Sequence, residues 1–289
     1  MFQRALICTD FTDGIYRLAQ FVPALAAGGF KSLVFFHNVP VETEREIPRV
    51  DPSQLEGPRQ KLIDLVREAP DGMDVTVEVQ MGRASDNILR LAKQHQVDLI
   101  ILGTPTRTLL EEKLFGSTTV RISEKTEVPL LILRPQLMST YTTAELELRC
   151  AHLFRYLLLP YDGSKGGNRL IEQIQTRCSQ NPETVLERIR LVWVIHEGIR
   201  QELLRDTPMH EAEATLDQIQ SHLAALNLVV NTAVVEGDPL EEILKMAEAH
   251  DIGAIATCSG GGGFLKWSTP SLTREILRRS WHPVLFFPS

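Results

Sequence analysis

A glycine-bounded segment carries the residues of this chain whose types and spacing could do chemistry. Gly103 ends an apolar run, and Gly116, Ser117 and Thr118 close the segment before the next apolar run. Glycine lets the backbone approach a ligand closely, and backbone N–H groups and hydroxyls are donors that suit phosphate oxygens. The segment from Gly103 to Thr118 is therefore a candidate phosphate-binding loop.

Two further polar side chains follow apolar runs earlier in the chain. Asp10 follows residues 5–9, and Asn38 comes shortly after residues 33–36. In an open parallel sheet, ligands bind outside the carboxyl ends of the strands, where the strand order reverses. A carboxylate at such an edge suits ribose hydroxyls or an adenine amine. We therefore expect Asp10, Asn38 and the loop after Gly103 to lie near one another.

Apolar runs alternate with segments of helical periodicity throughout the first half of the chain. Strands are predicted at residues 5–9, 33–36, 75–79, 97–102 and 128–133. Helices are predicted near residues 15–22, 55–68, 85–92 and 118–125. Pro23 predicts a kink or an early end of the first helix, and Ser85 is the predicted cap of the third. Because parallel strands need crossover connections, this order indicates a doubly wound α/β domain with helices on both faces.

The same order of elements begins again after residue 152. Matching landmarks lie 152 to 155 positions apart, in the pairs Asp10 and Asp162, Gly82 and Gly237, Asp98 and Asp251, and Pro129 and Pro283. A period near 153 is a whole domain and not a short repeat. The sequence therefore predicts two copies of one fold, residues 1–137 and 153–289, joined by a linker at residues 138–152.

Composition and charge limit which binding partners and which cellular compartment we expect for this chain. The 289 residues carry a formal net charge of −7, and Lys and Arg are scattered, which argues against nucleic acid or an acidic membrane surface as a partner. The four cysteines lack the spacing of a zinc site or a disulfide framework, and a reducing cytoplasm fits them best. No signal-peptide pattern and no uncharged apolar run of about 18 residues is present. We expect a cytoplasmic protein that binds small molecules or other proteins.

The order and spacing of these residues resemble the universal stress protein family. Its nucleotide-binding members carry Gly-x-x-Gly, then nine residues, then Gly-Ser or Gly-Thr. Here Gly103 and Thr106 stand at the first two positions, and Gly116 and Ser117 close the pattern after nine residues. The turns Thr9-Asp10-Phe11-Thr12 and Pro160-Tyr161-Asp162-Gly163-Ser164 resemble the turn after the family's first strand. The similarity covers both copies, so the chain looks like a tandem member.

The resemblance implies a fold and a ligand. Each copy is expected to form a five-stranded parallel sheet of order 3-2-1-4-5, and the copies are expected to pair through residues 130–133 and 284–287 as an intramolecular pseudo-dimer that could dimerise further. The implied ligand is ATP, or AMP or ADP, with Mg²⁺ accompanying the nucleotide. The implied contacts are Cys8, Thr9, Asp10, Asn38, Gly103, Thr106, Arg107, Gly116, Ser117 and Thr118.

The sequence departs from the family pattern in both copies. Thr106 replaces the second glycine, and its Cβ can hinder a close backbone approach to phosphate. Asn38 replaces the usual apolar contact with the base. In the second copy Ala256 and Ser259 stand at the glycine positions, and Thr269-Pro270-Ser271 replaces the closing motif. A degenerate second site would comprise Asp162, Ile195, Gly260, Gly261, Gly262 and Ser271.

Two functions remain open from the sequence. One is a stress-response regulator or sensor that binds an adenosine nucleotide mainly in the first copy. No Walker motif or positioned base is present in the sequence, so ATP hydrolysis is expected to be very slow, and whether the chain is an enzyme stays open. The alternative is an interaction scaffold for an unknown protein partner, in which both sites are degenerate and nucleotide is not needed.

Overall fold

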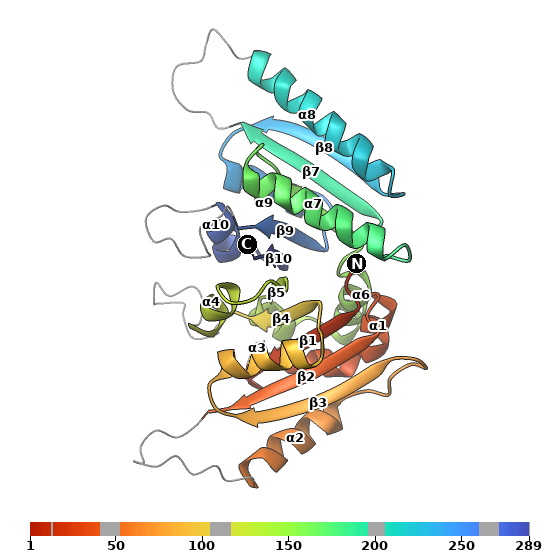
Figure 1. Cartoon of the computed structure of the whole chain (residues 1–289), viewed down its shortest axis with the longest axis vertical. Coiled ribbons are helices and arrows are strands. Elements are labelled where there is room, and N and C mark those ends of the chain that lie inside the picture. Colours follow the sequence, from red (N-terminus) through yellow and green to blue (C-terminus); the bar gives the residue numbers. More distant parts are fainter. Residues whose placement is uncertain (13, 41–52, 105–116, 196–205, 260–271, 289) are drawn as a thin grey trace. The chain divides into compact units, whose positions relative to one another are not determined.

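The computed structural model describes residues 1–12, 14–40, 53–104, 117–195, 206–259 and 272–288. The chain divides into two compact units, one of residues 2–151 and the other of residues 152–287 with Met1. Figure 1 labels their helices and strands along the chain. In the part of the chain described, no helix is both long and apolar enough to cross a membrane.

A five-stranded parallel sheet forms the centre of the first unit. Its strands are β1 (Arg4–Thr9), β2 (Ser32–Val39), β3 (Asp74–Met81), β4 (Leu99–Gly103) and β5 (Leu130–Leu133). They lie in the order β3-β2-β1-β4-β5, and every pairing is parallel. Strand β1 is central, and its residues Ala5, Leu6 and Ile7 are fully buried because helices cover both faces.

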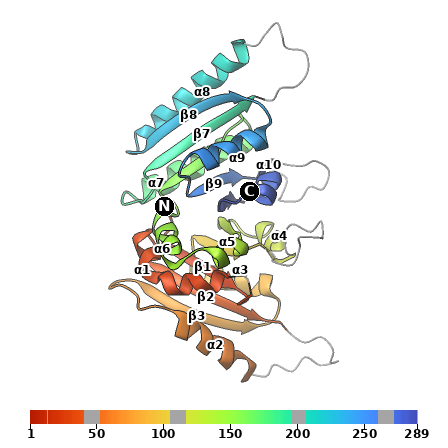
Figure 2. The ribbon, with the colours of Figure 1, turned by 180° about the vertical axis from the view of Figure 1, so that it is seen from behind.

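Helices cover this sheet on both sides. The 3-10 helix η1 (Ile15–Phe21), α1 (Val22–Ala27) and α2 (Ser53–Leu65) lie on one face, and α3 (Ala84–Gln94) and α4 (Ser117–Ser123) lie on the other. Figure 2 shows α1 together with α5 (Pro135–Thr140) and α6 (Thr143–His152). Helix α6 and the last residues of α5 fall within the predicted linker. The crossover helices place the carboxyl ends of all five strands along one edge.

One local prediction was confirmed in this unit and one was wrong. Pro23 was expected to kink the first helix or end it early, and the 3-10 helix η1 ends at Phe21, whose φ of −117° is not helical. Pro23 lies in the first turn of the next helix, α1, where proline is tolerated because the first N–H groups of a helix have no intrahelical acceptor. Ser85 was expected to cap α3, but Arg83 is at the N-cap and Ser85 is buried inside the helix.

The second unit repeats the sheet. Its strands are β6 (Tyr156–Pro160), β7 (Arg188–Ile195), β8 (Val229–Glu236), β9 (Ala254–Cys258) and β10 (Val284–Phe287), in the order β8-β7-β6-β9-β10. All pairings are again parallel. Counted within each unit, both sheets have the order 3-2-1-4-5, so the predicted fold is confirmed.

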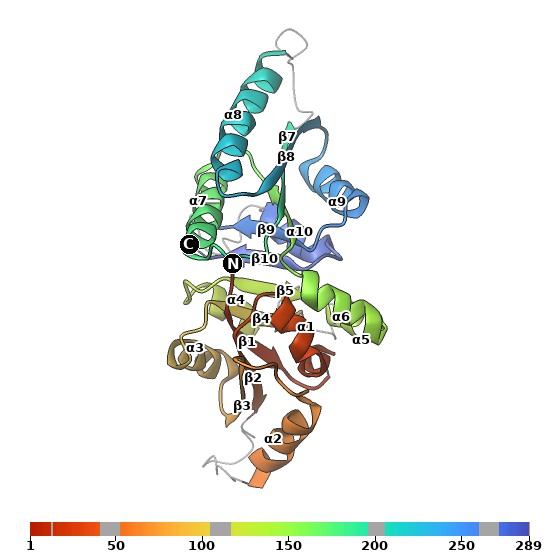
Figure 3. The same ribbon diagram turned by 90° about the vertical axis from the view of Figure 1, so that its right-hand side faces the viewer.

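The helices of the second unit also lie on both faces of their sheet. Figure 3 shows α7 (Lys165–Gln180) and α8 (Asp206–Ala224) on one side and α9 (Pro239–Ala249) on the other, where α10 (Leu272–Arg279) packs against it. Helix α9 begins at the predicted signal, because the Asp238 side chain accepts a 3.0 Å hydrogen bond from the Glu241 N–H. Pro239 occupies the first turn.

Helix α2 depends on a single buried anchor. Leu62 is its only fully buried residue, at 0% exposure, whereas the neighbouring Ile63 is 46% exposed. Leu62→Ala should lower the free energy of unfolding by about 2–5 kcal/mol because it leaves a cavity under the helix. Ile63→Ala should cost less than about 1 kcal/mol. Urea denaturation followed by circular dichroism measures both, and equal losses would contradict this account.

Candidate functional site

The candidate site is the edge of the first sheet at which its parallel strands end. Here β2 and β4 lie on opposite sides of β1, and the next strands, β3 and β5, extend the sheet in opposite directions. Parallel register places Thr9 level with His37 on β2, and Ile7 level with Ile101 on β4. Asp10 therefore leaves the sheet beside Asn38, and Gly103 ends β4 on the other side of β1. This is the reversal of strand order at which open α/β sheets bind ligands.

Asp10 forms a tight turn that leaves part of its carboxylate available. Its Oδ1 accepts hydrogen bonds from the Thr12 N–H and hydroxyl, both at 2.8 Å. Phe11 between them has φ of +66°, and its N–H donates to the Thr9 hydroxyl at 3.1 Å. Because Asp10 is exposed and these bonds use Oδ1, its Oδ2 can accept a hydrogen bond from a ligand hydroxyl.

The rings of Phe11 and His37 form the wall beside this turn. Their centroids lie 4.5 Å apart, and His37 Nδ1 is 2.9 Å from the carbonyl oxygen of Thr9, to which it donates. Burial lowers the pKa of His37 below 6.5, although its hydrogen bond to Thr9 opposes the shift. The imidazole is therefore neutral at physiological pH and holds the end of β2 against β1.

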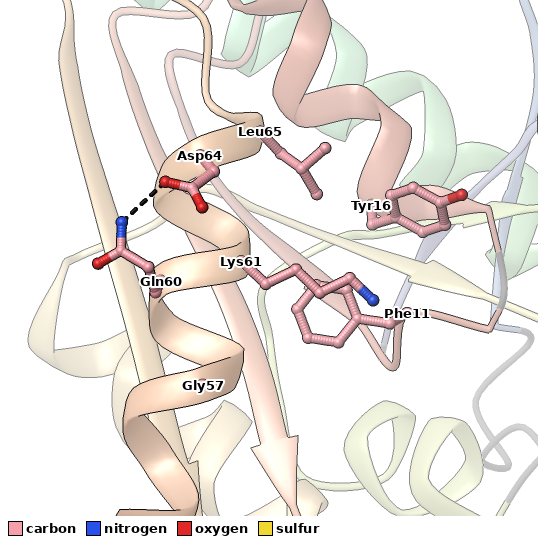
Figure 4. Close-up of a pocket in the computed structure, with 7 residues that line it drawn as sticks. All are labelled: Phe11, Tyr16, Gly57, Gln60, Lys61, Asp64 and Leu65. Atoms are coloured by element: carbon pink, nitrogen blue, oxygen red, sulfur yellow. Dashed lines mark hydrogen bonds between the residues drawn. The ribbon is translucent and has the colours of Figure 1, made fainter.

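A pocket with a volume of about 430 Å³ adjoins the same turn on the side of α2 (Figure 4). Figure 4 shows Lys61 reaching across the ring of Phe11, where its ammonium lies 4.2 Å from the ring centroid. Gln60 donates to Asp64 at 2.7 Å. The lining residues are Phe11, Tyr16, Gly57, Gln60, Lys61, Asp64 and Leu65. The pocket thus offers aromatic walls and polar groups of both charges.

Asn38 is held by hydrogen bonds from two other elements. Its Nδ2 donates to the carbonyl oxygen of Gly82 at 2.9 Å, and its Oδ1 accepts from Asn87 Nδ2 on α3 at 2.9 Å. Asn87 Nδ2 also donates to the carbonyl oxygen of Met81 at 3.2 Å. The sequence analysis missed Asn87. Its only signal in the sequence is its place five residues after Gly82, the glycine that follows β3, at the start of a helix.

The structure brings only part of the predicted set together. Thr9, Asp10, Asn38 and Gly103 lie at one edge, but Cys8 is 9% exposed and packs in the core. Ser117 and Thr118 begin α4. Thr106, Arg107 and Gly116 lie outside the described residues. Among the described residues, no three His, Cys, Asp or Glu side chains gather closely enough to hold a metal ion.

The second unit repeats the turn with different side chains. Asp162 Oδ1 accepts from the Ser164 N–H at 3.0 Å, and Gly163 has φ of +72°, close to that of Phe11. Register places Trp193 where the first unit has His37. A Cβ on Gly163 would lie 3.1 Å from the Trp193 ring, so the indole fills this part of the edge.

Tyr161 completes this aromatic wall. Its ring meets Trp193 edge to face, with centroids 5.4 Å apart, and its hydroxyl donates to Asn168 Oδ1 at 2.6 Å. The corresponding residue of the first unit is the smaller Thr9, which is level with His37. These described positions of the second edge are therefore more aromatic than those of the first.

The strand register also changes, at two positions, which residue of the second unit corresponds to a residue of the first. The constant offset set Ala256 opposite Gly103, but the pairing of β9 with β6 makes Cys258 the counterpart of Gly103. The residue level with Asp162 is Val194, which precedes the predicted Ile195 by one position and corresponds to Asn38. Gly260, Gly261, Gly262 and Ser271 lie outside the described residues. At these described positions, the second edge thus has Val194 and Cys258 in place of Asn38 and Gly103.

The buried imidazole predicts a pH dependence of stability. Since the pKa of His37 is lower in the folded than in the unfolded chain, the unfolded chain binds more protons as the pH falls below about 6.5. The free energy of unfolding should then decrease, whereas above about pH 7 both states are neutral at this residue. His37→Gln should lose less stability than the wild type between about pH 7.5 and pH 5.5, as measured by urea denaturation. An equal loss would contradict the burial effect.

Comparison with known proteins gives the family. The model of the universal stress protein family matches residues 1–134 and 154–288. The universal stress protein MJ0577 of Methanocaldococcus jannaschii is 25% identical over 158 residues, which cover 46% of this chain and 96% of that protein. This relative therefore corresponds to one half of the chain.

Solved structures match the chain along its length. A universal stress protein from Archaeoglobus fulgidus is 17% identical with a TM-score of 0.66, and the match covers 99% of this chain and 98% of that chain. One from Pseudomonas aeruginosa, described as putative, is 13% identical with a TM-score of 0.62 and covers 99% and 93%. These likenesses establish the fold. With the family model matched in both halves, the chain belongs to the universal stress protein family and has two tandem domains.

Proposed function

We propose that the first unit binds ATP or a related adenosine nucleotide and that the chain is a nucleotide-responsive stress regulator with little or no catalysis. The observation that carries this proposal is the shared edge of Asp10, Asn38 and Gly103, with one carboxylate oxygen of Asp10 available. A carboxylate, an amide and a glycine-bounded loop suit the ribose, the base and the phosphates, respectively. Membership of the family supports the same ligand class.

The difference between the units supports one nucleotide per chain. Where the first edge has His37 and Asn38, the second has Trp193 and Val194. The indole packs against Gly163, and valine has no group that could hydrogen-bond a base.

The described groups at the first edge favour binding over turnover. Phosphoryl transfer needs a group that orients or deprotonates the attacking nucleophile. Asp10 is engaged by Thr12 through Oδ1, and His37 Nδ1 is engaged by the carbonyl oxygen of Thr9. The hydroxyl that Asp10 binds, that of Thr12, belongs to its own turn. We therefore expect any ATP hydrolysis to be very slow.

A nucleotide-independent interaction scaffold is the second candidate. The observation that favours it is the aromatic filling of the second edge by Tyr161 and Trp193, together with Thr106 at a position where the family has glycine. In that case a protein surface would carry the function, and neither unit would respond to nucleotide.

Calorimetric titration with Mg-ATP tests the proposal on paired variants. Asp10→Asn keeps an oxygen for the turn and removes the charge, so ATP affinity should fall at least about tenfold, as expected for a lost hydrogen bond to a charged group. Asp162→Asn is the same change in the matching turn and should leave affinity and a stoichiometry of one unchanged. Native mass spectrometry of the purified protein should detect bound adenosine nucleotide.

Two results would change this assignment. If saturating ATP gave neither heat nor a shift in melting temperature, and no nucleotide co-purified, the scaffold function would stand instead. If Asp162→Asn weakened binding and Asp10→Asn did not, the second unit would be the binding unit.

A further inference from the structure

We infer that Asn87 on α3 is a positioning residue that fixes the orientation of the Asn38 amide and thereby makes the first unit select adenine over guanine. The inference rests on the proposed nucleotide binding. It concerns a residue of α3, on the face of the sheet opposite α2, that acts through Asn38.

Two backbone carbonyl groups determine which way both amides point. A carbonyl oxygen only accepts, so Gly82 requires the NH₂ group of Asn38, and Met81 requires the NH₂ group of Asn87. Asn87 Nδ2 then donates to Asn38 Oδ1. Turning the Asn38 amide by half a turn would set its oxygen against the Gly82 oxygen and its NH₂ against that of Asn87. The network therefore allows one orientation.

The fixed amide keeps hydrogen-bonding capacity for a ligand. An Asn side chain has two N–H donors and two acceptor lone pairs, and the network uses one of each. Adenine offers an exocyclic amine donor next to a ring nitrogen acceptor, which is complementary to an amide. Guanine has a carbonyl acceptor and an N–H donor at the same two positions. Its acceptor would therefore face the Asn38 oxygen, and its donor would face the Asn38 NH₂ group. A binding site whose polar groups lack complementary partners in an analogue binds that analogue much more weakly.

The turn after β3 sets the backbone of this network. Gly82 has φ of +129°, which L side chains rarely adopt, and it lies against Asn87, whose Nδ2 would be 3.5 Å from a Cβ at this position. Both amides are half-buried. The turn thus presents the Met81 and Gly82 carbonyl groups to side chains from β2 and α3.

The second unit shows that the turn itself does not need the amides. Gly237 corresponds to Gly82, has φ of +148°, and is likewise followed five residues later by a side chain against it, that of Glu242. The counterpart of Asn38 is Val194, and Glu242 pairs with Lys245 at 2.6 Å. Because the same backbone forms without Asn38 and Asn87, the amides of the first unit are available for selecting a ligand.

Measured affinities for ATP and GTP test the inference. The wild type should prefer ATP. Asn87→Asp is isosteric but only accepts hydrogen bonds, so it competes with Gly82 for the Asn38 NH₂ group and should reduce the ratio of the two affinities at least about tenfold. Asn87→Leu removes the donor but leaves the bond to Gly82, so it should reduce the ratio by less. The matched control Glu242→Leu should leave the ratio unchanged. Melting temperatures are recorded for every variant.

The outcomes separate this inference from the proposed function. If Asn87 had a purely structural role, its variants would lower the melting temperature and weaken the binding of both nucleotides equally. An unchanged ratio of the ATP and GTP affinities in both Asn87 variants would overturn the inference, while ATP binding would stand. A wild type that binds ATP and GTP equally would also overturn it. A wild type that binds neither would overturn the proposed function, and the inference with it.

Discussion

The pairing of the first strand with two neighbours is the constraint on which the rest of each unit depends. Strand β1 is hydrogen-bonded to β2 on one side and β4 on the other, and β6 is paired in the same way with β7 and β9. Because both sides of such a strand are paired, the chain can turn out of the sheet only at the end of the strand, between its two neighbours. The chain does so through an aspartate turn followed by a residue of positive φ, in both units.

The two units therefore share a frame and differ in what fills it. At the residue of positive φ, the first unit has Phe11 and the second has Gly163. The choice is coupled to the neighbouring strand, because the Trp193 indole needs the space that a side chain on Gly163 would take, whereas His37 packs against the Phe11 ring. Trp193 and Val194 on β7 thus make the second edge less polar than the first, although both units form the same aspartate turn.

The sequence predicted the strands well because helices cover both faces of each sheet, so buried strands such as residues 5–9 read as continuous apolar runs. It also placed Asp10, Asn38 and Gly103 at the ends of their strands. It could not find Asn87, whose role depends on a turn that brings α3 to the end of β2. A constant repeat length misassigned Ala256 because the distance from the first to the fourth strand differs between the units. The start of α3, which was expected at Ser85, depended on local geometry that periodicity does not encode.

Tryptophan fluorescence distinguishes the two units of the chain. All three tryptophans, Trp193, Trp267 and Trp281, belong to the second half of the sequence, and the first unit contains none. Indole emission therefore reports on the second unit alone, whereas far-ultraviolet circular dichroism reports on the helices of both. Separation of the two unfolding curves would measure how independently the halves unfold. A ligand in the first unit would alter the emission only through coupling to the second, so the chain carries a built-in reporter of communication between its halves.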